Sequence, residues 1–216
     1  GFSSAARCLP AGRCVHSGNL VAAAIRGVRW QAHTRPHLIV LGGSQGAKVL
    51  NDTLPESCAL LRQSGRDFRV THVAGAADRV SELQAAYDAA GVDAEVLDFC
   101  RDMPALYAGA DLMIGRAGAM SVCEAAAVGL PTVFIPLPHA ADNHQYYNAA
   151  AVAEAGGAVL IEQHALSAGK LAGEVGRLLF DKALLEKMSR AALESQPRDS
   201  EARMLGVLGR WLEVSV

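Results

Sequence analysis

The chain is poor in aromatic residues, in net charge and in long apolar runs, and each shortage excludes a class of protein. Aromatic residues make up 5% of the 216 residues, and the formal net charge is −2. The strong positive field on which general nucleic-acid binding depends is therefore absent. No run reaches the roughly 18 uncharged apolar residues of a membrane helix. The longest candidate, 125–141, is interrupted by Pro131, Pro136 and Pro138.

Cysteine usage gives no sign of a zinc site or of a disulfide framework. The five cysteines are odd in number and show no C-x-x-C spacing, which favours a reducing compartment. His139 and His144 stand close together in the sequence, but no carboxylate or cysteine completes a recognisable metal-binding pattern around them. We therefore expect neither a metal nor any other cofactor.

What the chain has instead is an alternation of short apolar runs and helical patterns. Hydrophobic residues make up 51% and charged residues 19%, which suits a folded domain with a substantial core. Strands are expected at 37–41, 68–73, 95–99, 112–114, 132–135 and 158–161. Helices are expected at 47–63, 78–90, 102–108, 119–128, 143–155, 167–180, 182–193 and 200–212. This alternation predicts an α/β fold, a Rossmann-like, doubly wound parallel sheet of about six strands.

The first 36 residues differ from the rest in charge. They contain five arginines (Arg7, Arg13, Arg26, Arg29 and Arg35) and no acidic residue. An arginine-rich start can be a targeting peptide, but the chain begins with Gly1 rather than Met, which favours a linker or the remnant of another domain. We therefore expect a linker at 1–36 and a ligand-binding domain at 37–216.

The loops that follow the strands carry the candidate sites, because ligands bind at the carboxyl ends of the strands in such a sheet. The first loop, 42–47 (GGSQGA), opens a helix whose free N–H groups and positive dipole end favour an anion. It matches neither the dinucleotide-binding pattern nor the P-loop. A purely structural turn is an equally good interpretation of this loop taken alone.

A second loop, 115–124 (GRAGAMSVCE), also lies between a strand and a helix. Gly118 and Ala119 would present backbone amides to a phosphate, and Glu124 follows about one helical turn later. A carboxylate at that place can accept hydrogen bonds from the two vicinal hydroxyls of a ribose. The alternative is a solvated glutamate on the surface of the helix.

A third loop, 136–145 (PLPHAADNHQ), crowds polar side chains at the start of the next helix. Asp142 could be the N-cap of that helix. Gln145 carries both a donor and an acceptor and therefore suits paired sugar hydroxyls. His144 taken alone would more often be a packed or surface histidine.

Together these loops resemble the C-terminal, donor-binding half of the MurG family, which belongs to glycosyltransferase family 28. The resembling segments are LIVLGGSQGAKVLNDTLPE, LDFCRDMPALYAGADLMIGRAGAMSVCEAAAVGLP and PLPHAADNHQYYNAAAVAEAGGAVLIEQ, which cover residues 37–163 densely. Gly18-Asn19 resembles the family's linker, although Leu20 and Ala22 replace its proline and arginine. The resemblance implies the C-terminal domain of a GT-B fold, in which two Rossmann-like domains face a cleft.

The resemblance also implies a reaction. The family transfers N-acetylglucosamine, with inversion, from UDP-N-acetylglucosamine to lipid-linked N-acetylmuramoyl-pentapeptide, the step from lipid I to lipid II in peptidoglycan synthesis. It works peripherally at the cytoplasmic face of the bacterial inner membrane and has no D-x-D metal motif. The family's acceptor site and GGTGGH loop belong to an N-terminal domain without a counterpart in this sequence. We therefore expect this fragment to be soluble and to bind the donor without catalysing transfer, and we assign no catalytic residue.

The resemblance assigns donor-binding roles to individual positions. Glu124 would hold the ribose hydroxyls, and Gln145 would hold the hydroxyls of N-acetylglucosamine, with His144 replacing part of that contact. Ser44 would approach the nucleotide-sugar, and the backbone of Cys100 would bind the edge of the uracil. The diphosphate would lie on the start of a helix formed by Ala119, Met120, Ser121, Val122 and Cys123.

Two other functions stay open on the sequence. One is a stand-alone UDP-N-acetylglucosamine-binding subunit that needs a membrane-associated partner. The other is a protein like UDP-N-acetylglucosamine 2-epimerase, which has a related two-domain fold. The expected partners are UDP-N-acetylglucosamine and, through the other domain, a lipid-linked acceptor, with no nucleic acid.

Overall fold

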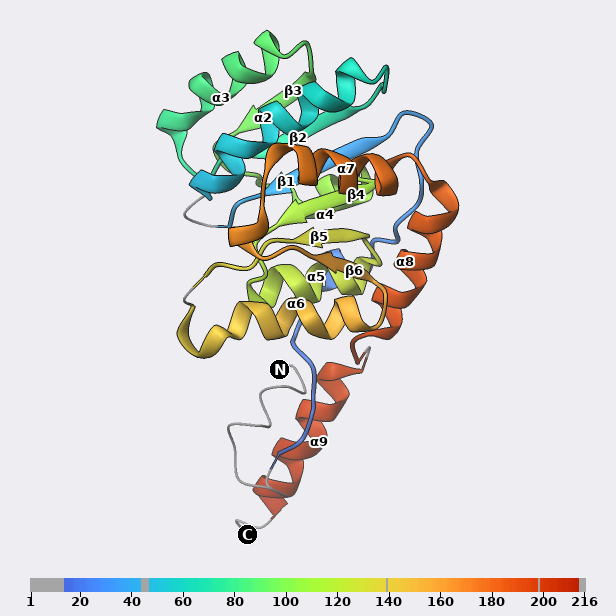
Figure 1. Cartoon of the computed structure of the whole chain (residues 1–216). Coiled ribbons are helices and arrows are strands. Elements are labelled where there is room, and N and C mark those ends of the chain that lie inside the picture. The colour runs from blue at the N-terminus through green and yellow to red at the C-terminus, as the bar shows by residue number, and fades with distance from the viewer. Residues whose placement is uncertain (1–13, 44–46, 139, 198, 214–216) are drawn as a thin grey trace.

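The computed structural model describes residues 14–43, 47–138, 140–197 and 199–213, and in them helices enclose one parallel sheet (Figure 1). The strands are β1 (His37–Leu41), β2 (Arg69–Val73), β3 (Asp93–Leu97), β4 (Leu112–Gly115), β5 (Thr132–Phe134) and β6 (Ala158–Leu160). Their order in this six-stranded sheet is β3-β2-β1-β4-β5-β6, and all neighbouring pairs are parallel. The predicted fold class is therefore confirmed.

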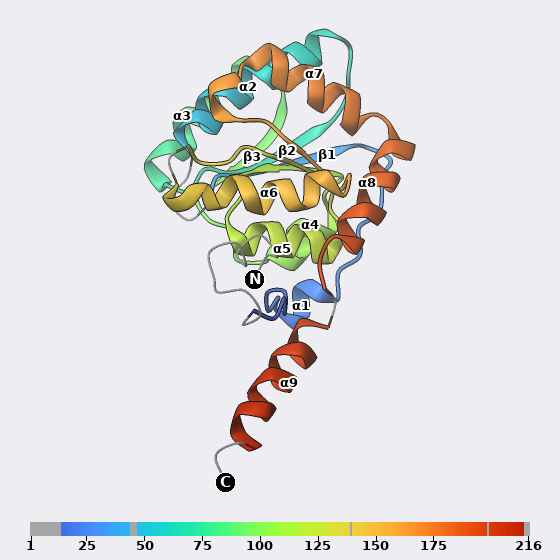
Figure 2. The same ribbon diagram turned by 60° about the horizontal axis from the view of Figure 1, so that its bottom comes forward.

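Helices cover both faces of the sheet, as Figure 2 shows. The helices of the described chain are α1 (Ala23–Arg26), α2 (Lys48–Gln63), α3 (Ala77–Ala89), α4 (Met103–Ala108), α5 (Ala119–Val128), α6 (His144–Glu154), α7 (Ala168–Leu179), α8 (Lys182–Glu194) and α9 (Ser200–Glu213), with 3-10 turns η2 (Ala141–Asn143) and η3 (Gln163–Ala165). Helices α2, α3 and α7 pack on one face, while α1, α4, α5 and α6 pack on the other. Helix α9 extends away from the sheet. Within the described ranges no helix is long and apolar enough to cross a membrane.

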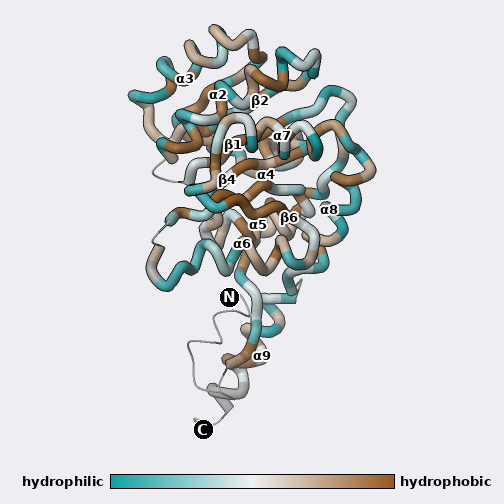
Figure 3. The backbone as a smooth tube through the Cα atoms, in the orientation of Figure 1, coloured by the Kyte–Doolittle hydropathy of each residue, from teal (hydrophilic) through white to brown (hydrophobic). Residues whose placement is uncertain are grey.

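The central strands supply side chains to both faces because successive residues of a strand point in opposite directions. In β1, Leu38 and Val40 lie in the core beneath α2 and α7, whereas Ile39 lies in the core beneath α5. Met113 in β4 faces the same side as Ile39. All four side chains are fully buried, and Figure 3 shows hydrophobic residues concentrated along the strands. Burial on both faces explains why these strands appear in the sequence as continuous apolar runs.

The predicted helices and strands agree with the structure to within one residue at each end, apart from β3, which lies two residues earlier than expected, and apart from α1, η2 and η3, which were not expected. Strand β3 begins at Asp93, two residues before the expected start at Glu95. It is an edge strand with several exposed positions, so its polar residues hide its start in a search for apolar runs. Helix α1 was not expected, because it has only four residues and lies in the segment interpreted as a linker.

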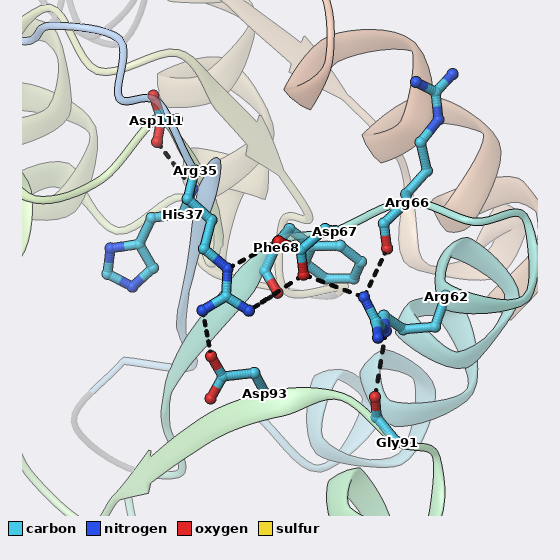
Figure 4. Close-up of polar contacts among 9 residues, drawn as sticks. All are labelled: Arg35, His37, Arg62, Arg66, Asp67, Phe68, Gly91, Asp93 and Asp111. Carbon is cyan, nitrogen blue, oxygen red and sulfur yellow. Dashed lines mark hydrogen bonds and ion pairs between the residues drawn. The ribbon is translucent and has the colours of Figure 1, made fainter.

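Ion pairs join three strands at the amino end of the sheet (Figure 4). Arg35 Nη1 lies 2.6 Å from Asp93 Oδ2, and Arg35 Nε lies 3.1 Å from Asp67 Oδ2. Arg62 Nη1 approaches the same Asp67 carboxylate at 3.2 Å. These hydrogen bonds lower the pKa of Asp67 and raise that of Arg35. Exposed pairs of this kind usually add little stability.

A buried carboxylate holds the segment before β1 against the sheet. Asp111, 2% exposed, precedes β4 and accepts hydrogen bonds from the backbone N–H groups of His33 at 2.7 Å and His37 at 2.8 Å. It satisfies two donors at the point where the chain enters β1. The chain at 33–37 is thus fixed against the same end of the sheet as the ion pairs.

Gly157, in the turn between α6 and β6, allows α8 to pack directly on the backbone. A Cβ at this position would lie 2.6 Å from both the N and Cα atoms of Ala192. We expect Gly157→Ala to lower the free energy of unfolding by about 1–3 kcal/mol, because the helix must move. The matched control is Gly173→Ala in α7, where a Cβ would have no heavy atom within 4 Å. Denaturant titration should show no loss there, and equal losses in both variants would contradict the packing argument.

His72 makes the stability depend on pH. It is fully buried, its Nε2 donates to Asn51 Oδ1 at 3.1 Å, and its Nδ1 accepts from Tyr87 Oη at 2.9 Å. Burial lowers its pKa from 6.5 to about 3. Between pH 6.5 and about pH 3, the unfolded chain therefore binds a proton at His72 that the folded chain does not bind. The contribution is complete above pH 6.5 and is lost as the pH falls toward 3, at up to about 1.4 kcal/mol per pH unit.

His72→Met tests this dependence. At neutral pH the variant should be less stable than the parent chain, because Tyr87 and Asn51 lose their partner. Between about pH 6 and pH 4 its free energy of unfolding should fall less steeply, by up to about 1.4 kcal/mol per unit. Chemical unfolding at several pH values measures both slopes, and identical slopes would refute the assignment.

Candidate functional site

An open hollow of about 950 Å³ lies at the carboxyl ends of β1 and β4. From these neighbouring strands the chain winds outward in opposite directions, which is where open α/β sheets bind ligands. Gly42 and Gly43 line one side, and the start of α5 lines the other. The volume falls within the range of about 300–1,000 Å³ that is usual for small-molecule sites.

The first turn of α5 presents to this hollow backbone amides that have no partner among the described residues. Gly118 is the N-cap, and no side chain in the described ranges caps the helix. The N–H groups of Ala119, Met120 and Ser121 precede the first intrahelical bond, which runs from Val122 N to Gly118 O at 3.0 Å. All three residues line the hollow. Three amides and the positive end of the helix dipole make this a suitable place for an anion.

Two of the five residues predicted to hold the diphosphate, Val122 and Cys123, do not line the hollow. Val122 is fully buried, and its N–H is used within the helix. Cys123 is 4% exposed, and its Sγ accepts a hydrogen bond from Asn19 Nδ2 at 2.9 Å, on the linker side of α5. The structure therefore brings three of these five positions to the hollow.

Arg116 is a site residue that sequence reasoning missed. Its Nη1 donates to the backbone oxygens of Ile135 at 3.0 Å and Pro136 at 3.1 Å, and its Nη2 donates to Gln163 Oε1 at 2.7 Å. Burial lowers the pKa of the half-buried guanidinium, which lines the hollow. The arginine connects the ends of three strands and brings positive charge to the amides of α5. The sequence signal that could have identified Arg116 is its position inside the second glycine-containing loop, between Gly115 and Gly118.

Gln145 holds the loop before α5 and keeps half of its amide for other use. Its Oε1 accepts from the backbone N–H groups of Leu137 at 3.0 Å and Ala117 at 3.3 Å. Asn148, on the same helix, donates from Nδ2 to the oxygen of Ala117 at 3.1 Å. The acceptor predicted to bind a sugar is therefore occupied, while the Gln145 NH2 group has no partner among the described residues.

The other polar residues of the third loop are more exposed. His144 is the exposed first residue of α6. Asp142 does not cap this helix, because Asn143 occupies the N-cap position, and both residues have left-handed backbone angles, with φ of 51° and 52°. Ser44 and His139 lie outside the described residues.

Glu124 and Cys100 form a second group, beside α4. Glu124 lies about 4.5 Å further along the axis of α5 than Ser121, is half-buried, and accepts a hydrogen bond at Oε2 from Tyr107 Oη at 2.9 Å. Cys100 is half-buried in the loop between β3 and α4, close to the same tyrosine. Burial, followed by the charge of Glu124, raises the pKa of Tyr107. The described residues contain no group of three or more side chains able to hold a metal ion.

Comparison with known proteins decides the family. Residues 37–204 match the sequence profile of the glycosyltransferase family 28 C-terminal domain. The chain belongs to this family. The crystal structure of MurG from Acinetobacter baumannii superposes on the family 28 domain with a TM-score of 0.75 at 32% identity, covering 90% of this chain and 55% of that one.

Two curated bacterial relatives share more than 40% of their residues with this chain over the matched part. The UDP-N-acetylglucosamine--N-acetylmuramyl-(pentapeptide) pyrophosphoryl-undecaprenol N-acetylglucosamine transferase of Azoarcus sp. is 46% identical over 166 residues, which cover 77% of this chain and 46% of the relative. The protein of the same name from Burkholderia vietnamiensis is 42% identical over 182 residues, covering 82% and 49%. The family 28 domain described here thus spans about half the length of the curated relatives it matches.

Arg116 provides a test of anion binding in the hollow. We expect Arg116→Met to weaken the binding of inorganic pyrophosphate about ten-fold, because a charge-assisted contact contributes about 1.5–3 kcal/mol. Isothermal titration calorimetry measures the affinity. The control is Arg177→Met on the exposed face of α7, which removes the same charge away from the hollow. Equal effects of both substitutions would point to nonspecific electrostatics.

Proposed function

We propose that this family 28 domain binds UDP-N-acetylglucosamine as the donor half of an enzyme that transfers N-acetylglucosamine to lipid-linked N-acetylmuramoyl-pentapeptide. The observation that carries the proposal is the hollow between β1 and β4, which is lined both by Arg116 and by the start of α5, where three amides have no partner in the described part of the chain. The names of the curated relatives support the substrates, since they name UDP-N-acetylglucosamine, a muramyl-pentapeptide carrier lipid and a transferase.

In this proposal the diphosphate lies at the start of α5. The acceptor hydroxyl forms a bond to the anomeric carbon and gives its proton to a base of the acceptor-binding domain, while the bond to UDP breaks and UDP leaves with the electron pair. Negative charge then grows on the diphosphate next to the N–H groups of Ala119, Met120 and Ser121 and next to the guanidinium of Arg116. Donors that are already oriented stabilise this charge without rearranging, which is the main electrostatic contribution to catalysis in such sites.

The two ends of the donor would lie on either side of the diphosphate. Glu124 would accept hydrogen bonds from the ribose hydroxyls, and the backbone at Cys100 would bind the uracil. The free NH2 group of Gln145, with His144 and Ser44, would contact the N-acetylglucosamine. Since Gln145 Oε1 is bonded to two backbone amides, this residue would donate to a sugar hydroxyl and accept nothing from it.

We further propose that the acceptor binds to a separate domain, to which residues 1–36 form the connection. The acceptor is a lipid, so the enzyme would work peripherally at the cytoplasmic face of the bacterial inner membrane. Residues 37–216 would then be the donor-binding domain of a GT-B fold.

The test is Glu124→Gln in the 216-residue chain. The substitution keeps the shape of the side chain but removes the charge, and charge-assisted hydrogen bonds are worth about 1.5–3 kcal/mol against about 1 for neutral ones. We expect UDP affinity, measured by calorimetry, to fall about ten-fold or more, with little change in melting temperature. Glu186→Gln, on the exposed side of α8, is the matched control and should bind UDP like the parent chain.

2′-Deoxy-UDP provides the second arm. It should bind the parent chain poorly and respond little to Glu124→Gln, because one of the two hydroxyls is missing. If Glu124→Gln leaves UDP binding unchanged while the chain stays folded, the ribose assignment is wrong. If the parent chain binds neither UDP nor UDP-N-acetylglucosamine, the proposed donor site is wrong as a whole.

A further inference from the structure

The carboxylate of Glu124 is held by a buried tyrosine from another helix. Tyr107 Oη, in α4, donates to Glu124 Oε2 at 2.9 Å. Tyr107 is 1% exposed, so a ligand cannot reach its ring, whereas Glu124 is half-buried and stays partly accessible. The tyrosine therefore acts on any ligand through the glutamate.

The hydroxyl of Tyr107 acts as a hydrogen-bond donor to Glu124. Burial and the neighbouring Glu124 charge both raise its pKa, so the phenol keeps its proton and serves as a donor. A buried O–H group that loses its acceptor is costly, and so the pair disfavours rotamers of Glu124 that break the bond. One oxygen of the carboxylate is thus held before a ligand arrives, and Oε1 has no hydrogen-bond partner among the described residues.

Helix α4 gives Tyr107 a fixed position. The helix begins at a side-chain cap, where Asp102 Oδ1 accepts from the backbone N–H of Ala105 at 3.0 Å. Tyr107 then packs in the same core as Ile39 and Met113, beneath the sheet. The loop that carries Cys100 leads directly into the capped start of this helix. One short, anchored helix therefore links that loop to the middle of α5.

We propose that Tyr107 is a positioning residue for nucleotide binding, which holds Glu124 Oε2 so that Oε1 is presented to the ribose hydroxyls. The inference rests on the proposed function, since it requires a ribonucleotide at α5. A carboxylate that is already ordered loses less rotational freedom when it binds, so the hydroxyl raises affinity without touching the ligand. A purely structural role would instead tie α4 to α5 with no preference for the nucleotide.

The experiment uses Tyr107→Phe in the 216-residue chain, which removes one oxygen and keeps the ring. We expect affinity for UDP to fall about three- to ten-fold, while affinity for 2′-deoxy-UDP changes less, so discrimination between the two nucleotides shrinks. In the background of Glu124→Gln, Tyr107→Phe should cause little further loss, because the two residues act as one unit. The ratio of the two affinities does not depend on the folded fraction, so a moderate loss of stability leaves the test intact.

Tyr87→Phe is the matched control. Tyr87 is also fully buried, and its hydroxyl also bonds a polar side chain, His72 Nδ1 at 2.9 Å. It belongs to α3, however, and not to the helices beside the proposed site. It should lower the melting temperature and leave nucleotide discrimination unchanged.

The outcomes separate the two proposals. If Glu124→Gln weakens UDP binding and Tyr107→Phe does not, the positioning role is wrong and the donor site stands. The same holds if Tyr107→Phe weakens both nucleotides equally, since that is the signature of a structural role. If the parent chain binds no UDP, the donor site fails and the positioning role fails with it.

Discussion

The close approach of β1 and β4 is the constraint on which the site depends. At the end of β4, a Cβ on Gly115 would lie 2.9 Å from the backbone oxygen of Leu41, so the two strands can meet this closely only because the residue is glycine. Beyond this point the chain after β1 turns to α2 on one face, and the chain after β4 turns to α5 on the other. The hollow is the space left where these paths separate, and the start of α5 necessarily opens into it.

The polar side chains around the hollow make hydrogen bonds within the protein itself. Gln145 and Asn148 together bind both the N–H and the oxygen of Ala117, and Arg116 binds two strand-end oxygens and Gln163. These bonds fix the loop that ends at Gly118, and so they fix the direction of the α5 amides. The groups left for an anion are then backbone N–H groups, whose orientation costs nothing at the moment of binding.

The sequence predicted most of the fold but only part of the site. Helix α5 was predicted with its observed bounds because Gly118 precedes it and Gly129, with φ of 78°, ends it, and both are local signals. The unpaired amides and Glu124 follow from the same local pattern. Arg116, Asn148 and Tyr107 did not emerge, because their partners lie between 17 and 47 positions away in the chain. Periodicity and turn residues carry no information about such contacts, which arise only when the strands are arranged in the sheet.

The charged side chains are paired differently at the two ends of the sheet, and this difference favours the carboxyl end as the place for the proposed anion. At the amino end, Arg35 lies between the carboxylates of Asp67 and Asp93, so its charge is compensated. At the carboxyl end, the hydrogen bonds of Arg116 in the described chain go to neutral oxygens, and its pKa is lowered by burial with no carboxylate to oppose the effect. The half-buried guanidinium of Arg116 thus brings positive charge to a helix start whose first three N–H groups have no partner among the described residues. If a diphosphate binds here as proposed, its negative charge would lie next to this guanidinium and next to these amides, which would favour its binding.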